Sequence, residues 1–280
     1  VALTVSGTTT LTTSANDATI TLDTTTNAFT GAMTITTNDA SGTDADVVID
    51  GGTTALQIAA STIDGDLTLT SGNASGITDT GTVTVGGNFS ATTDANNGVI
   101  NMGSMAVDGS FTLAPNGTGA VTIVNDAGLT LAASTMGGTF SGTATTGNIT
   151  DTGALAITGA TTLVTSANDA TITLDTATNA FTGAITITTN DASGTDADVT
   201  IDGGTTALQI AASTVDGDLT LTSGNASGIT DSGTVTVGGN FSATTDANNG
   251  VINMGSMAVD GSFTLAPNGT GAVTIVNDAG

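Results

Sequence analysis

The sequence predicts an all-β fold, a parallel β-solenoid, and three observations point to it. The chain lacks Lys, Arg, His, Cys, Trp, Tyr and Glu, which leaves mainly Thr, Ser, Gly, Ala, Val, Ile, Leu, Asn and Asp. β-branched residues favour strands, whereas Gly, Asn and Asp favour turns. A long tandem repeat and a shorter glycine motif inside it then give the periodicity that stacked coils need.

The same composition restricts the chemistry that the chain can perform. It offers no His or Lys as a base near neutral pH, no Cys nucleophile and no cation for a phosphate or an oxyanion. Nucleic-acid binding depends on Lys and Arg, and no apolar run approaches the ~18 residues that cross a bilayer. We therefore expect no enzyme activity, no nucleic-acid partner and no membrane insertion.

The long repeat begins again at position 153. Residues 1–128 recur as 153–280, with 11 differences in 128 aligned positions. The sequence thus predicts one continuous solenoid, made of a first repeat of six coils over 1–152 and an incomplete second copy over 153–280. Because the second copy stops in mid-unit at Gly280, we expect the chain to be an excerpt from a longer array.

The shorter motif has the form apolar-x-Gly-x-apolar-x-apolar. Its glycines are Gly7, Gly31, Gly65, Gly87, Gly109, Gly138 and Gly159, then Gly183, Gly217, Gly239 and Gly261. Most of them follow one another at similar short intervals, but the intervals from Gly31 to Gly65 and from Gly109 to Gly138 are longer. This predicts typical coils of about 21–25 residues, two longer coils in each unit, and about 11 coils in all.

Strand parity separates an inner from an outer face, because successive side chains point to opposite sides. Positions two before, two after and four after each glycine are mostly apolar, which predicts a ladder with Phe89, Phe111 and Phe140 on successive coils. The glycines share the inner parity, so we expect them at tight bends where no Cβ fits. Three short strands in most coils suggest a roughly triangular tube. The related phrases 56–62 and 129–135 are expected to be lengthened strands or small bulges.

Several phrases resemble the repeats of filamentous-haemagglutinin-like exoproteins and other giant bacterial surface proteins. They are Gly65-Asp-Leu-Thr-Leu-Thr, Gly76-Ile-Thr-Asp-Thr-Gly-Thr-Val-Thr-Val85 and Gly147-Asn-Ile-Thr-Asp-Thr-Gly153. The resemblance covers nearly the whole chain and rests on composition and period. It implies a right-handed parallel β-helix, secretion from a bacterium, and a role in adhesion or matrix building.

Crowded carboxylates make the first candidate site. Asp39, Asp44 and Asp46 lie close together in the sequence and recur as Asp191, Asp196 and Asp198. Oxygen ligands suit Ca²⁺, so these residues are calcium candidates and calcium is the candidate cofactor. The alternative is a solvated acidic loop, since the chain contains no Gly-Gly-x-Gly-x-Asp calcium repeat.

Three further sites compete with simpler explanations. Paired Asp residues hydrolyse glycosides in some proteins, but here the same Asp recur in every copy and none stands out. Sequons occur at Asn73, Asn88, Asn116, Asn148, Asn225, Asn240 and Asn268, as chance predicts in a Thr-rich chain. Outward hydroxyls form a Thr-x-Thr array on one face, the kind of surface that ice-binding solenoids present. Its first column is Thr10, Thr34, Thr68, Ser90, Thr112, Ser141, Thr162, Thr186, Thr220, Ser242 and Thr264.

These observations favour a structural role over a catalytic one. The sequence predicts a repeat segment of a secreted extracellular fibre, sheath or matrix filament, located outside the cell or on its surface. Its expected partners are other copies of itself, a cell surface or glycans. The stalk of a bacterial adhesin and an ice-binding solenoid are the alternatives.

Overall fold

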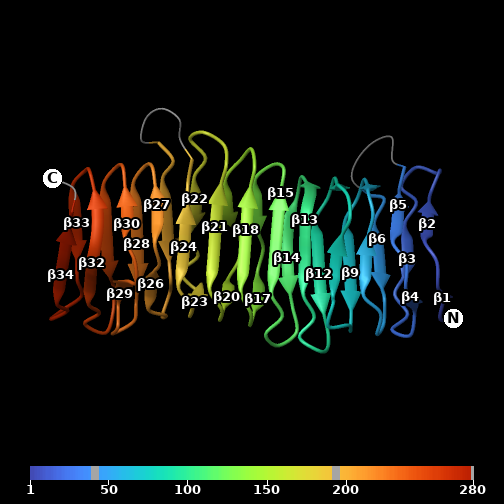
Figure 1. The fold of residues 1–280 in the computed structure, drawn as a ribbon, viewed down its shortest axis with the longest axis horizontal. Helices are drawn as coiled ribbons and strands as arrows, with labels where there is room; N and C mark the ends of the chain where they lie inside the picture. The colour runs from blue at the N-terminus through green and yellow to red at the C-terminus, as the bar shows by residue number, and fades with distance from the viewer. Residues whose placement is uncertain (39–43, 191–195, 279–280) are drawn as a thin grey trace. The chain divides into compact units, whose positions relative to one another are not determined.

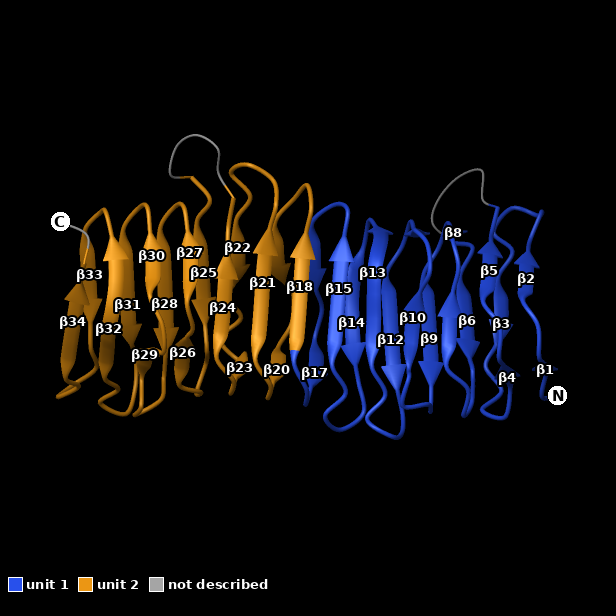
Figure 2. Ribbon diagram, viewed as in Figure 1, with its two compact units in different colours: residues 1–139 blue, residues 140–280 orange. Residues whose placement is uncertain are grey.

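The computed structural model describes residues 1–38, 44–190 and 196–278, which form two compact units of parallel β-solenoid. Unit 1 is Val1–Thr139 and unit 2 is Phe140–Gly280 (Figure 2). In each unit the chain runs along one broad sheet, turns a corner and returns along a second (Figure 1). The two units hold about 12 turns, and the described residues contain no helix, which confirms the predicted fold class.

We call the first broad sheet wall 1. Its strands pair in parallel with those of the next turn, so each turn is one rung of the sheet. In unit 1 these strands are β3 (Ile20–Leu22), β6 (Val47–Asp50), β9 (Leu67–Ser71), β12 (Phe89–Thr93), β14 (Ser110–Ala114) and β16 (Leu129–Leu131). In unit 2 they are β19 (Ile149–Asp151), β22 (Ile172–Leu174), β25 (Val199–Asp202), β28 (Leu219–Ser223), β31 (Phe241–Thr245) and β33 (Phe263–Ala266).

Wall 2 is the opposite sheet, in which some turns contribute two short strands. In unit 1 its strands are β2 (Thr9–Thr12), β5 (Met33–Thr36), β7 (Leu56–Ile58), β8 (Ser61–Ile63), β10 (Ile77–Asp79), β11 (Val83–Val85), β13 (Ile100–Val107) and β15 (Val121–Asn125). In unit 2 they are β18 (Phe140–Ala144), β21 (Thr161–Thr165), β24 (Ile185–Thr188), β26 (Leu208–Ile210), β27 (Ser213–Val215), β29 (Ile229–Asp231), β30 (Val235–Val237), β32 (Ile252–Val259) and β34 (Val273–Asn277). Short strands lie beside the walls: β1 (Thr4–Val5), β4 (Ala28–Phe29), β17 (Ser134–Met136), β20 (Leu155–Ile157) and β23 (Ala180–Phe181).

The predicted alternation of inner and outer residues is confirmed along these strands. In β9, β12, β21 and β28 every second residue is buried and those between are half-buried. Phe89 and Phe111 lie one above the other in wall 1, with ring centroids 5.8 Å apart in an edge-to-face arrangement. Each such side chain contributes about 1.5–3 kcal/mol by its burial, so the core of each turn is completed by its neighbours.

The division into turns differs from the expected one. Register along wall 1 of unit 1 leads from Ile20 through Val47, Leu67, Phe89 and Phe111 to Leu131, one turn at each step. No step in this series is as long as the interval from Gly31 to Gly65 or from Gly109 to Gly138, so these intervals are not single long coils. Each spans about one and a half turns, because the strand after the glycine has moved from one wall to the other.

This exchange of walls also corrects the expected phenylalanine ladder. The strands after Gly65, Gly87 and Gly109 lie in wall 1, whereas β5 after Gly31 lies in wall 2. Phe140 begins β18, which pairs with β21 of wall 2, so Phe140 does not continue the column of Phe89 and Phe111. Many turns do contain the three short strands that the sequence predicts, as in β9, β10 and β11, and in some turns the third strand belongs to a separate sheet formed by β17, β20 and β23.

The expected bulges are present where the phrase 56–62 joins β7 to β8. Met33 pairs with Ile58 and Thr36 pairs with Thr62, so β5 advances by three positions while its partner advances by four. The Ser61 hydroxyl fills the gap: it donates to Ala59 O at 2.8 Å and accepts from Ile35 N at 2.9 Å. In the phrase 129–135, Ser134 likewise donates to Ala132 O at 2.9 Å and accepts from Leu113 N at 2.9 Å.

In the part of the chain that the structure describes, no element is a helix of sufficient length and hydropathy to cross a bilayer.

Candidate functional site

Polar side chains at the corners of the solenoid bond one turn to the next. In unit 1 Asp46 Oδ1 accepts from Asp66 N at 2.8 Å, and Asp66 Oδ1 accepts from Asn88 N at 2.6 Å. Asn88 Oδ1 then accepts from Ser110 N and from the Ser110 hydroxyl, at 2.9 and 2.8 Å. We call these four residues the corner ladder. Hydrogen bonds to a carboxylate contribute about 1.5–3 kcal/mol each, so the ladder fastens successive turns.

The motif glycines make room for this ladder. A Cβ on Gly65 would contact Asp46 Oδ1 and lie 2.8 Å from Ala45 C, and a Cβ on Gly87 would contact Asp66 Oδ1 and lie 2.8 Å from Gly65 C. The prediction that these glycines occupy bends where no Cβ fits is thus confirmed. The structure adds the reason: the vacant volume holds the polar side chain of the turn before.

The same ladder recurs in unit 2. Asp198 Oδ1 accepts from Asp218 N at 2.7 Å, and Asp218 Oδ1 accepts from Asn240 N at 2.6 Å. Asn240 Oδ1 accepts from Ser262 N at 2.9 Å. The sequence analysis did not predict this ladder. The signal was available, because Asp66, Asn88 and Ser110 all follow a motif glycine and all carry a side-chain acceptor.

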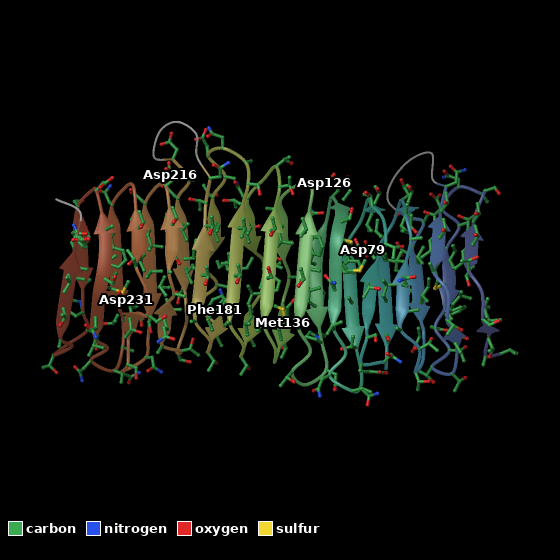
Figure 3. The ribbon with its side chains drawn as sticks, viewed as in Figure 1. Asp79, Asp126, Met136, Phe181, Asp216 and Asp231 are labelled. Atoms are coloured by element: carbon green, nitrogen blue, oxygen red, sulfur yellow. The ribbon has the colours of Figure 1, made fainter. Side chains whose placement is uncertain are left out.

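In each unit one further carboxylate, Asp79 or Asp231, binds the backbone of a bulge in wall 2; both residues are labelled in Figure 3. Asp79 accepts from Gly103 N at 3.0 Å and from Ser104 N at 2.7 Å, where the register of β13 shifts between Met102 and Met105. In unit 2, Asp231 makes the equivalent bonds to Gly255 N and Ser256 N, at 2.8 and 2.6 Å. These carboxylates replace partners that the bulge removes from the strand ladder.

The calcium candidates are only partly within the described residues. Asp39 and Asp191 lie outside them. Asp44 and Asp196 are exposed, and their backbone carbonyls accept from Asp46 N and Asp198 N at 3.0 and 2.9 Å. One oxygen of Asp46 and one of Asp198 is used in the corner ladder.

Residues 1–38, 44–190 and 196–278 contain no group of three or more side chains that could hold a metal ion. Asp39 and Asp191 lie outside these ranges. Calcium binding by these residues therefore stays a prediction.

A group of mutually repelling carboxylates lies at one end of wall 1 in unit 2. Burial raises the pKa of Asp202 above its ordinary value, and repulsion from Asp246, Asp175 and Asp151 acts in the same direction, while a bond from Gly204 N opposes both. Asp151 Oδ2 accepts from Asn179 Nδ2 at 2.7 Å, whereas its buried Oδ1 has no hydrogen-bond partner. No Lys, Arg or His exists in the chain to neutralise this group.

Carboxylates avoid the broad face of wall 1. Among the described Asp residues, those within strands are the last residue of their strand: Asp50, Asp79, Asp151, Asp202 and Asp231. Of these, Asp79 and Asp231 lie within wall 2, at its bulges. Others lie at corners, as Figure 3 shows for Asp126 in unit 1 and Asp216 in unit 2. Wall 1 therefore presents a neutral, hydroxyl-rich face with anionic borders.

The hydroxyl array expected on one face is divided between two. Thr10 pairs with Thr34 in wall 2, and Ser141, Thr162 and Thr186 follow one another in wall 2 of unit 2. The remaining members lie in wall 1. The exchange of walls is again the reason, since the outward residue after a motif glycine follows its strand to either side.

At several sequons the asparagine side chain makes a hydrogen bond within the protein. Asn73 Nδ2 donates to Thr53 O at 2.9 Å, and Asn88 Nδ2 donates to Asp66 Oδ1 at 3.2 Å. Asn116 Nδ2 lies 3.5 Å from Asp94 O.

The part of the chain that the structure describes has no pocket.

Comparison with known proteins identifies a family of repeats. A family model described as "Repeats of unknown function (DUF5649)" matches residues 1–36, 44–106, 118–188 and 196–254. A search of curated proteins and a search of solved structures gave no match. The last three segments follow one another at roughly half of the long period, which agrees with walls that exchange within each long repeat. The matches cover most of the sequence, and the chain belongs to this family of repeats.

Proposed function

We propose that the chain is a structural repeat segment of a secreted extracellular fibre, sheath or matrix filament. The observation that carries the proposal is the use of the polar residues. The corner ladder, the Asp79 bulge contact and the Ser61 bridge all join one turn to the next, and all recur in unit 2. Polar groups that recur in each copy and serve stacking are suited to extending length.

The composition supports an extracellular setting. The chain carries a formal charge of −25 and has no Lys or Arg, so trypsin-like proteases find no site to cleave. Solvent cations then surround the anionic corners and reduce their repulsion. A non-catalytic role, self-association through stacked turns, and contact with a cell surface or glycans complete the proposal.

The stalk of a bacterial adhesin is the narrower version of the same role. It shares the repetitive architecture and adds a binding domain at one end of a longer protein. The resemblance to filamentous-haemagglutinin-like exoproteins supports this version. The remainder of the gene distinguishes the two, since a stalk requires a distinct terminal binding domain and a fibre does not.

Electron microscopy of the native material tests the proposal. A fibre protein should give thin filaments of uniform width, with a fibre-diffraction reflection near ~4.8 Å along the axis from strands perpendicular to it. Compact, separate particles that stay separate at physiological salt would contradict it. Immunogold labelling of whole cells checks the location, and label confined to the cell interior would remove the extracellular setting.

A further inference from the structure

Wall 1 of unit 2 carries an unbroken column of outward hydroxyls. Register runs from Thr150 through Thr173, Thr200, Thr220 and Ser242 to Thr264, over five successive pairings without a shift. Thr222 and Thr244 form a second column beside it, two positions further along their strands. The glycine motif did not predict this column, because Thr150, Thr173 and Thr200 do not follow a motif glycine.

Unit 1 lacks the same continuity. Its column reads Thr21, Val48, Thr68, Ser90 and Thr112, so Val48 stands where unit 2 has Thr200. The two copies differ at few positions, and this is one of them. Unit 1 therefore serves as a natural comparison for unit 2.

Five of the column hydroxyls are available to an outside partner. In the described part of the chain, the hydroxyls of Thr173, Thr200, Thr220, Ser242 and Thr264 make no hydrogen bond within the protein. In wall 2, by comparison, the hydroxyls of Thr234 and Ser256 lie 3.0 Å apart and bond each other. Thr is stiff at χ1, so the free hydroxyls and methyl groups are held at the fixed spacing of the turns, about 4.8 Å.

Such an array selects the kind of partner. A single hydroxyl gains little by exchanging bulk water for another hydrogen-bond partner, so affinity requires many contacts made together. Only a partner with its own regular lattice can meet every rung at once. The partner lattice should also be neutral, because the carboxylates of wall 1 lie at strand ends and corners and the face between them carries no charge.

We infer that wall 1 of unit 2 binds a neutral, ordered lattice of water, the surface of an ice crystal, through the column from Thr173 to Thr264. A crystalline polysaccharide is the competing neutral lattice, but sugar rings favour stacking on aromatic side chains. Phe241 is fully buried, and Phe263, which pairs with it on the next strand, points inward as well. The outer face of wall 1 in unit 2 therefore offers no aromatic platform. Ice binding is independent of the structural role proposed above.

The experiment measures thermal hysteresis and ice shaping with the full 280-residue chain. Thr220→Tyr places a bulky ring in the middle of the column, and Tyr is tolerated in strands, so the fold should persist. Thr236→Tyr is the matched control, an exposed outward position of β30 in wall 2. We expect the wild type to shape ice, Thr220→Tyr to lower its hysteresis about tenfold, and Thr236→Tyr to leave it unchanged.

A second variant keeps the result independent of folding defects. Val48→Thr completes the column of unit 1 and should raise hysteresis, while far-UV circular dichroism verifies the fold of each variant. Absence of ice shaping by the wild type overturns the inference. Equal losses from Thr220→Tyr and Thr236→Tyr overturn its assignment to wall 1, and retention on crystalline cellulose or chitin without ice shaping overturns it in favour of a polysaccharide.

Discussion

Gly87 is a position where a single added methyl group should destabilise the protein by a measurable amount. A Cβ there would contact Asp66 Oδ1 and lie 2.8 Å from Gly65 C and 2.9 Å from Asp66 N. Backbone atoms on that side cannot retreat, because Gly87 N donates to Gly65 O at 3.0 Å. The Asp66 carboxylate must therefore move and release Asn88 N and Asn88 Nδ2, which it holds at 2.6 and 3.2 Å.

The expected cost of Gly87→Ala follows from these contacts. Loss of a charge-assisted hydrogen bond costs about 1.5–3 kcal/mol, and forcing a methyl group into packed surroundings costs about 1–3 kcal/mol. Some of this cost is recovered as Asp66 finds water, so we expect a loss of about 2–4 kcal/mol in the free energy of unfolding. Urea denaturation followed by circular dichroism measures it.

Gly103→Ala is the matched control. No atom lies within 4 Å of a Cβ built on Gly103, and its backbone does not require a left-handed conformation. This substitution should change stability by less than about 1 kcal/mol, and the smaller entropy of the unfolded chain favours it. Equal effects of the two substitutions would refute the steric argument, as would a Gly87→Ala protein of wild-type stability.

A double-mutant cycle tests the role of the Asp66 carboxylate. Asp66→Ala by itself removes the bonds to Asn88. If displacement of this carboxylate causes much of the damage, Gly87→Ala should cost clearly less in the Asp66→Ala background. Strict additivity would show that the methyl group acts on the backbone alone.

Three further predictions concern buried or charged groups. The pKa of Asp202 is raised from its ordinary value of 3.8, so its contribution to stability falls as pH rises from about that value through the folded-state pKa. Asp202→Asn should therefore be more stable than the wild type at pH 7, by less than about 1 kcal/mol after solvent screening. In thermal melts this difference should shrink in high salt and at pH 4. Thr161 is fully buried with an unpartnered hydroxyl between Phe140 and Ile185, so Thr161→Val should stabilise by about 1 kcal/mol in urea denaturation, whereas the half-buried outward Thr162→Val should not. If the residues around Asp46 and Asp198 bind calcium, the melting temperature should rise with millimolar Ca²⁺ more than with equal ionic strength of Na⁺, and an unchanged melting temperature in a chelator would count against the site.

The fold class and the inner face of each strand could be predicted from the sequence alone. Composition excluded helices and favoured strands, and alternation around Gly65, Gly87 and Gly109 identified the side chains that are buried in the structure. These features are local: a strand has a period of two wherever it lies, and a glycine at a bend is visible from its neighbours alone. The candidate calcium residues were visible for the same reason, as a local crowding of carboxylates.

The wall that each strand joins is a property of the three-dimensional arrangement. The same motif fits either wall, since both demand inward apolar residues, and the choice depends on how much chain the preceding corners consume. That choice separates Phe140 from Phe111, splits the predicted hydroxyl array, and brings Thr173 and Thr200 into one column with Thr220. The corner ladder is tertiary as well, because its members come from successive turns, far apart in the sequence, and meet only when the turns stack.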